Sequence, residues 1–259
     1  MLGAASRFRR IVVPEGSKLV IDDAPLNLTL TSLLVYGNLS MGSAACRLRS
    51  AISITFAPAA GVATNQMMTL RGMNGSTVDI HGELFSPTWT RLARTAPPGA
   101  STIALQQPVN WRPGQLVAVP TSLWKDECRN QNEVREIANI SADGRSMTFT
   151  TPLQFMHYAG NEYQTEVVLL SRSILLQGSN ETAANLTGGH LRIESKHGRI
   201  SGVLGYRMGQ QFQMGSYPFH FHMAGEVPPD SYMTDNAVYA SYWRAHLAAQ
   251  ASFSSSILP

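Results

Sequence analysis

Charged residues are scarce in this chain, and their scarcity argues against several classes of protein. Only 14% of the 259 residues are Asp, Glu, Lys or Arg, well below the usual quarter. The formal net charge is +3, and the only basic cluster is Arg7-Phe8-Arg9-Arg10, so we expect no nucleic-acid partner. Low charge together with many Ser, Thr, Asn and Gly residues favours a β-rich extracellular protein over a helical cytosolic one.

The chain also lacks a segment that could span a membrane. The uncharged stretch 24–46 contains Asn27, Gly37 and Asn38, which interrupt it, and the stretch 51–70 is broken by Pro58. Arginines precede any apolar run at the start, so no signal peptide is recognised. An extracellular or cell-surface location is then expected only if the chain is part of a larger ectodomain that carries the signal or anchor elsewhere.

Cysteine is nearly absent, whereas sequons for N-glycosylation are frequent. Cys46 and Cys128 permit one disulfide or none, and neither lies in a CxxC motif or beside a histidine, so metal binding or thiol catalysis through them is not expected. Asn-x-Ser/Thr sequons are candidate glycan sites on a secreted protein. They begin at Asn27, Asn38, Asn74, Asn139, Asn180 and Asn185.

Helical periodicity is also hard to find. Short apolar runs of β type alternate with turns rich in Gly, Pro, Asn and Asp, as at Pro14-Glu15-Gly16 and Ala142-Asp143-Gly144. In the last third of the chain these runs return about every 20 residues, which is typical of a solenoid. We therefore predict an all-β fold with a parallel β-helix, and a β-sandwich is the alternative. Residues 133–138 fit either a short helix or an edge strand.

The most informative pattern is the alternation Phe219-His220-Phe221-His222. A strand sends alternate side chains to opposite faces, so the phenylalanines, with Tyr217, are predicted to be buried on one face. His220 and His222 would then share the other face. They are either two half-exposed histidines of an ordinary strand or part of a functional site.

Three kinds of chemistry are open to these histidines. Two neutral imidazoles can hold a divalent metal ion if a neighbouring coil supplies a third ligand. Alternatively, His220 or His222 acts as a base while Arg207 or Arg244 holds a uronate. Hydrolysis of a glycosidic bond instead needs two carboxyl groups. The nearby candidates for these are Glu226, Asp230 and Asp235.

Two further features could belong to a site. Asp79 and His81 alternate around Ile80 and so share a strand face, where a hydrogen-bonded structural pair is the simpler interpretation. Tryptophans and tyrosines can stack on a pyranose ring. Tyr217 and Trp243, together with Arg207, are the candidate substrate contacts, and His220, His222, Asp235 and Arg244 are the candidate catalytic residues.

An ordered series of glycine-containing motifs resembles the G-eight domain, named for its eight glycines. The motifs lie at 12–16, 33–39, 70–72, 79–82, 88–99 and 111–115. The continuation, with Gly188-Gly189-His190-Leu191 and the block from Tyr217 to Gly225, resembles the β-helix that follows this domain in two groups of proteins. One is the cell-surface hyaluronidase and hyaluronan-binding group, and the other is the fibrocystin-like group.

This resemblance implies a right-handed parallel β-helix behind an N-terminal G-eight domain, with residues 8–150 in the domain and 151–259 in the helix. It also implies an ectodomain that binds or depolymerises a hyaluronan-like polysaccharide, as a hydrolase or lyase. The alternative is a non-catalytic adhesion or receptor module of the fibrocystin-like type. Arg207, Gln115 and Tyr239 stand where the family pattern has His, Asp and His, and the loss at 239 is predicted to remove a stacking partner of the His220/His222 pair.

Overall fold

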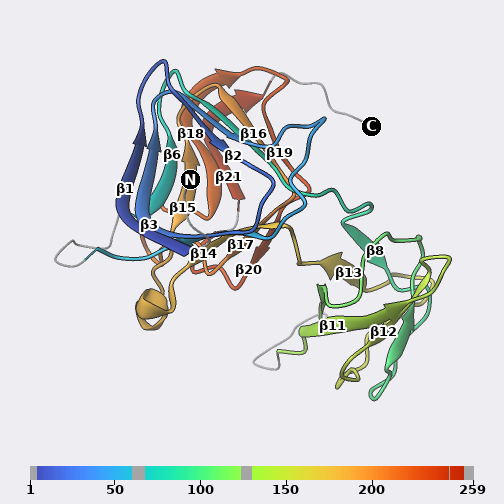
Figure 1. The fold of residues 1–259 in the computed structure, drawn as a ribbon. Coiled ribbons are helices and arrows are strands. Elements are labelled where there is room, and N and C mark those ends of the chain that lie inside the picture. The colour runs from blue at the N-terminus through green and yellow to red at the C-terminus, as the bar shows by residue number, and fades with distance from the viewer. Residues whose placement is uncertain (1–4, 60–67, 124–129, 245, 254–259) are drawn as a thin grey trace. The chain divides into compact units, whose positions relative to one another are not determined.

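The computed structural model describes residues 5–59, 68–123, 130–244 and 246–253, and their regular secondary structure is almost entirely β-strand (Figure 1). Within these ranges one helical element occurs, the 3₁₀ helix η1 (Asn180–Asn185). The chain divides into two compact units. The first combines Met1–Leu84 with Arg172–Pro259, and the second is Phe85–Ser171. Residue 150, the boundary expected from the sequence, lies inside the second unit, because strands before residue 85 pair with strands after residue 171.

The first unit, which we call the β-helix unit, is a parallel β-helix with three walls. Its long strands β1 (Ala5–Val13) and β3 (Leu26–Val35) each run through the first two walls. The first wall continues with β5 (Ile52–Phe56), β14 (Ile174–Gly178), β17 (Val203–Tyr206) and β20 (Ala237–Tyr239). The second continues with β6 (Thr69–Gly72), β15 (His190–Ile193), β18 (Phe219–Val227) and β21 (His246–Phe253). The third contains β2 (Lys18–Ile21), β4 (Asn38–Met41), β7 (Thr77–His81), β16 (His197–Ser201) and β19 (Tyr232–Thr234).

Chain order shows how the coil is built. β5, β6 and β7 supply the first, second and third walls in turn, as do β14, β15 and β16, and then β17, β18 and β19. Every pairing within the three walls is parallel, and the only register shift among the described strands of these walls lies between His222 and Gly225, where β18 pairs with β21. A strand therefore lies beside the strand one coil earlier. The predicted parallel β-helix is confirmed, and with it the all-β class.

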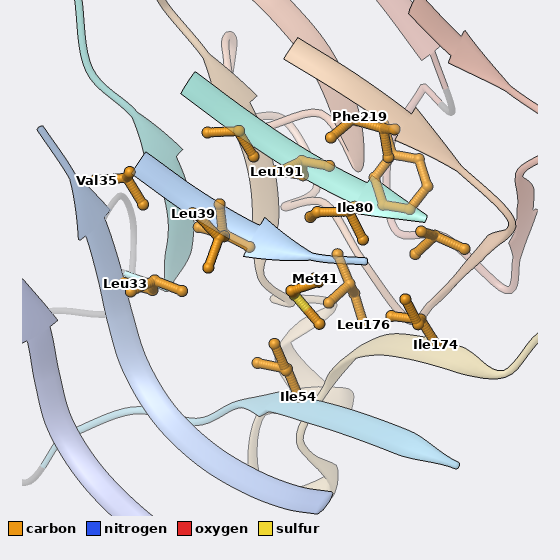
Figure 2. Close-up of a cluster of buried hydrophobic side chains, with 14 of the residues drawn as sticks. Leu33, Val35, Leu39, Met41, Ile54, Ile80, Ile174, Leu176, Leu191 and Phe219 are labelled. Carbon is orange, nitrogen blue, oxygen red and sulfur yellow. The ribbon is translucent and has the colours of Figure 1, made fainter. Parts of the chain in front are cut away.

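Inward-facing apolar side chains of the three walls form one core (Figure 2). Because side chains alternate along a strand, every second residue points inward, and in-register pairing stacks these residues on one another. Leu33, Leu70, Leu191 and Phe219 form such a row across four strands of the second wall. All four are at most 2% exposed. Burial of each stabilises the fold by about 1.5–3 kcal/mol, which a single coil could not obtain alone.

The second unit, which we call the inserted unit, enters the chain between β7 of the third wall and β14 of the first. It is a six-stranded antiparallel sheet around a separate apolar core. Its strands are β8 (Trp89–Arg91), β9 (Thr102–Ala104), β10 (Leu116–Val119), β11 (Glu133–Ile140), β12 (Ser146–Phe149) and β13 (Glu166–Leu169). Residues 133–138, for which a helix or a strand was predicted, belong to β11.

A buried carboxylate organises one end of the inserted unit. Glu133, 4% exposed, accepts hydrogen bonds from Arg135 Nη2 at 2.5 Å and from the backbone N–H of Gln154 at 2.6 Å. His157, which is fully buried, places Nε2 3.3 Å from the same carboxylate and Nδ1 2.8 Å from the Pro120 carbonyl. These contacts join the ends of two strands to the segment after β12, which explains why a charged group is retained inside.

Candidate functional site

Polar side chains gather on the outer face of the second wall because three of its strands alternate in the same register. On β15 the apolar Leu191 and Ile193 point inward, and on β18 Phe219 and Phe221 do so. The residues between them point outward. We call this outer group the histidine–arginine cluster, and it comprises Arg71, His190, Arg192, Glu194, His220 and His222.

Register brings these residues together from distant parts of the chain. Arg71, Arg192 and His220 occupy one row on β6, β15 and β18. Thr69 and His190 form the neighbouring row. Adjacent parallel strands lie about 4.8 Å apart, so side chains in one row are in contact distance. The cluster therefore follows from the coil itself.

Glu194 links the two arginines. Its Oε1 lies 2.7 Å from Nη2 of Arg71 and 2.6 Å from Nε of Arg192. The side chains of Arg71, Arg192 and Glu194 are 35%, 23% and 16% exposed. One carboxylate thus serves two guanidinium groups, and the row keeps one unit of excess positive charge that solvent can reach.

The histidines of the cluster are neutral at pH 7. The ring centroids of His220 and His190 are 6.3 Å apart, and those of His220 and His222 are 5.5 Å apart. Burial, reinforced by the neighbouring positive charge of Arg192, lowers the pKa of His190 and of His220 to about 3. Burial also lowers the pKa of His222, which is less enclosed. A neutral imidazole with so low a pKa is a weak base at pH 7.

Several imidazole nitrogens are buried without a hydrogen bond of normal geometry. They are Nδ1 and Nε2 of His220, Nδ1 of His190 and Nδ1 of His222. A weak interaction with the backbone of Tyr217 raises the pKa of His220, but burial lowers this pKa by much more. Leaving a buried polar atom unsatisfied costs about 1–3 kcal/mol, so these nitrogens mark a place suited to a polar ligand.

The segment before β18 covers the cluster. Gln210, 1% exposed, donates through Nε2 to the Gly188 carbonyl at 3.2 Å, and its backbone N–H donates to the Ser216 carbonyl at 3.0 Å. Tyr217 was predicted to share the buried face of the phenylalanines. Instead its ring meets the ring of His220 edge to face at 5.3 Å, because the strand begins only after Pro218.

The structure brings some predicted site residues together and separates others. His220 is completely buried, so it touches no polymer in this conformation, whereas His222 is partly exposed. Asp235 belongs to a different group of contacts, because its backbone carbonyl accepts from Arg172 Nε at 2.9 Å and its carboxylate lies 3.5 Å from Ser201 Oγ.

The other predicted site residues, Arg207, Trp243 and Arg244, contact residues outside the histidine–arginine cluster. Arg207 lies over the ring of Tyr206 at 4.8 Å and hydrogen-bonds the side chain of Asn180. Trp243 meets Phe212 at 5.5 Å, and the exposed Arg244 lies 6.0 Å from the Trp243 ring.

The sequence predicted that Tyr239 takes the place of a stacking partner of His220 and His222, and this prediction is wrong. Tyr239 lies on β20 in the first wall, where it stacks on Tyr206 with ring centroids 5.8 Å apart. The histidines lie on β18 in the second wall, and the row of His220 is supplied by Arg192 from the preceding coil. The prediction assumed that residues 19 positions apart stack, whereas a three-walled coil stacks residues only within one wall.

Asp79 and His81 share the outer face of the third wall, as predicted, but they do not pair with each other. Arg199 donates through Nε to Asp79 at 2.6 Å and through Nη1 to Asp230 at 3.1 Å. His81, 2% exposed, places Nε2 2.7 Å from the hydroxyl of Tyr232. Burial is the main cause that lowers the pKa of His81, which is therefore neutral.

Other sequence features are located as follows. All six sequon asparagines are exposed. Cys46 is free and exposed, while Cys128 lies outside the described residues. Among the residues that the structure describes, no group of three or more His, Cys, Asp or Glu side chains is placed to hold a metal ion. In the same part of the chain, no helix has the length and apolarity needed to cross a membrane.

Sequence reasoning missed four of the six members of the cluster. Arg71, His190, Arg192 and Glu194 are absent from the predicted site. Their signal is the alternation His190-Leu191-Arg192-Ile193-Glu194, which repeats the pattern of Phe219–His222 one coil earlier.

Comparison with known proteins finds two family matches in this chain. Residues 3–93 match the model of the G8 domain, and residues 186–248 match the model of the CEMIP β-helix. The chain carries a G8 domain and a CEMIP β-helix. The histidine–arginine cluster draws Arg71 from the G8 domain and its other members from the CEMIP β-helix.

Two relatives match nearly the whole chain. A G8 domain-containing protein of Dictyostelium discoideum is 39% identical over 244 residues, which are 92% of this chain and 21% of that protein. Fibrocystin-L of Mus musculus is 26% identical over 303 residues, covering 95% of this chain and 7% of its own. The chain therefore spans about a fifth or less of these relatives. A solved structure, the Gp54 tailspike of Acinetobacter baumannii bacteriophage AP22, overlaps 80% of this chain and 33% of its own, with 12% identity and a TM-score of 0.31.

Proposed function

We propose that this chain is part of an extracellular protein and binds an acidic polysaccharide of the hyaluronan type through the histidine–arginine cluster. The observation that carries the proposal is the row of Arg71 and Arg192 on adjacent strands, held by the single carboxylate of Glu194. Excess positive charge presented by two preoriented guanidinium groups suits the carboxylates of a uronate-containing polymer. The exposed sequons and the CEMIP β-helix support an extracellular setting.

The site favours binding over cleavage. His190 and His220, with pKa values of about 3, are poor proton acceptors at pH 7. Glu194 is engaged by two arginines, and the second carboxyl group that hydrolysis needs is not among the members of the cluster. His222 and Tyr217, whose rings meet that of His220, are the predicted site residues that we propose as contributors to this site. The contacts described above for Arg207, Trp243, Asp235 and Arg244 do not include members of the cluster. No step of the proposed binding uses a metal ion.

The test is a binding and degradation assay with defined polysaccharides. Hyaluronan oligosaccharides are titrated against the wild-type chain and against Arg71→Gln/Arg192→Gln, with Arg49→Gln, an exposed arginine outside the cluster, as the control for lost charge. We expect the double variant to bind at least about tenfold more weakly, which corresponds to about 1.4 kcal/mol. Wild-type affinity should fall as NaCl rises, because exposed charges are screened.

Three results would contradict the proposal. Equal affinity of the double variant and the wild type would remove the cluster from binding. Shortening of high-molecular-weight hyaluronan by the wild type, abolished in His222→Ala, would show that the site cleaves rather than only binds. If no acidic polysaccharide binds at all, the alternative of a non-catalytic adhesion module with purely structural histidines is favoured.

A further inference from the structure

The turn that covers the histidine–arginine cluster exposes large apolar side chains. Phe212 is 78% exposed and Met214 is 89% exposed. Gly215, the next residue, lies beside the ring of His222: a β-carbon at Gly215 would lie 3.9 Å from Cε1 of His222. The turn that carries these exposed side chains therefore adjoins the proposed binding site.

Phe212 contributes little to the stability of the fold in its present position. Its backbone φ is +58°, in the left-handed region that glycine adopts readily and a phenylalanine does not. An exposed ring also contributes little hydrophobic stabilisation. A residue that is both strained and exposed is a candidate for contact with something outside the chain.

The position of Phe212 is well defined despite this strain. The turn is closed by backbone hydrogen bonds from Gln213 to the Gln210 carbonyl and from Ser216 to the Gln213 carbonyl, each 3.2 Å long. The ring packs against Trp243, with centroids 5.5 Å apart and planes at 72°. Trp243 in turn packs against Gly209, where a β-carbon would lie 3.2 Å from its Cβ. The ring is thus held in place while most of its surface faces solvent.

We propose that Phe212 is a stacking platform for one pyranose ring of the polysaccharide. The apolar face of a sugar packs on the phenyl ring, while a carboxylate elsewhere on the same polymer reaches Arg192 or Arg71. This inference rests on the proposed function and adds a specificity-determining contact to it. A polymer that combines apolar ring faces with negative charge matches the adjoining aromatic and cationic surfaces better than a simple anion does.

The experiment compares binding and stability in variants of Phe212. Affinity for hyaluronan oligosaccharides and melting temperature are measured for Phe212→Ala, Phe212→Trp and Phe212→Gly. Phe8→Ala, which removes another exposed phenylalanine from β1, is the control. We expect about a tenfold loss of affinity in Phe212→Ala at an unchanged melting temperature, and affinity close to wild type in Phe212→Trp. Phe212→Gly should bind as weakly as the alanine variant while melting at a higher temperature, because glycine relieves the backbone strain.

The outcomes separate this inference from the proposed function. If the wild type binds and Phe212→Ala binds equally well, the stacking platform is wrong while the arginine site stands. If both the alanine and the glycine variants melt at a lower temperature, Phe212 serves the fold and the inference is also wrong. If the wild type binds no polysaccharide, the proposed function has failed, and the platform fails with it.

Discussion

Acid should destabilise the β-helix unit through His190 and His220. The pKa of each lies at about 3 in the folded chain, against an ordinary value of 6.5. Above about pH 7.5 both states carry neutral imidazoles, so neither histidine makes stability depend on pH. Between pH 6.5 and pH 3 the unfolded chain binds protons that the folded chain does not, and stability therefore falls as pH falls.

The expected effect is large enough to measure. At pH 5 an unfolded histidine is almost fully protonated and a buried one is not. This difference lowers the free energy of unfolding by about 2 kcal/mol for each residue and by about 4 kcal/mol for the two. His190 faces Arg71, Arg192 and His222, and His220 faces Arg192, His222 and His190; each of these groups opposes protonation. Glu194 favours protonation of His222. Burial remains the largest cause for both residues.

Urea unfolding at pH 7.5 and pH 5.0 measures the effect, with hydrogen exchange of β15 and β18 to isolate this unit from the inserted one. His220→Gln should lose about half of the pH dependence, and His190→Gln/His220→Gln most of it. His197→Gln, at an exposed position on β16, is the control and should behave as the wild type. A His220→Gln chain with the full wild-type dependence on pH would refute this reasoning.

Three further predictions concern single contacts. In Glu194→Gln two arginines lose their common carboxylate, so the free energy of unfolding should fall by about 1–3 kcal/mol. Hyaluronan binding should nevertheless become tighter and depend more steeply on salt. Weaker binding in titration calorimetry would contradict this. Gly205→Ala should cost about 1–3 kcal/mol, because a β-carbon there would lie 2.9 Å from Cζ of Phe219, and adding Phe219→Leu should recover part of the lost melting temperature. An unchanged melting temperature in the single variant would argue against so tight a fit. Glu133→Gln should destabilise the inserted unit by about 3–5 kcal/mol, because it removes a buried carboxylate from its partners. Glu136 is exposed on the same strand, and Glu136→Gln should leave the stability unchanged. Equal hydrogen exchange of β11 in both variants would show that the buried carboxylate is dispensable.

The main architecture could be predicted because it depends on local alternation. Phe219 and Phe221 are buried and His220 and His222 lie on the outer wall, since the strand period decides which face each residue takes. The insertion could not be predicted in the same way. Strands of an antiparallel sheet and of a β-helix both alternate with period two, so β8 to β13 carry no local signal that they leave the coil.

Site composition was predictable only in part, for a related reason. Arg71 and Glu194 are 123 positions apart, and Asp79 and Arg199 are 120 apart. Each pair forms because an 87-residue unit, Phe85–Ser171, separates two consecutive coils in the chain while they remain neighbours in space. Tyr239 shows the opposite case. It is only 19 residues from His220 in sequence, and a contact was predicted, but the two residues lie in different walls of the coil.

The sequence alone determined the kind of structure: short alternating strands, a buried aromatic face and a polar outer face, because hydrophobic burial acts on each strand through its own period. Only the tertiary structure decided which polar residues meet, which histidines are sealed from water and where a strained phenylalanine is exposed. Those outcomes depend on register between coils and on the turn that folds over them, and pairing across such distances leaves no pattern in any one segment.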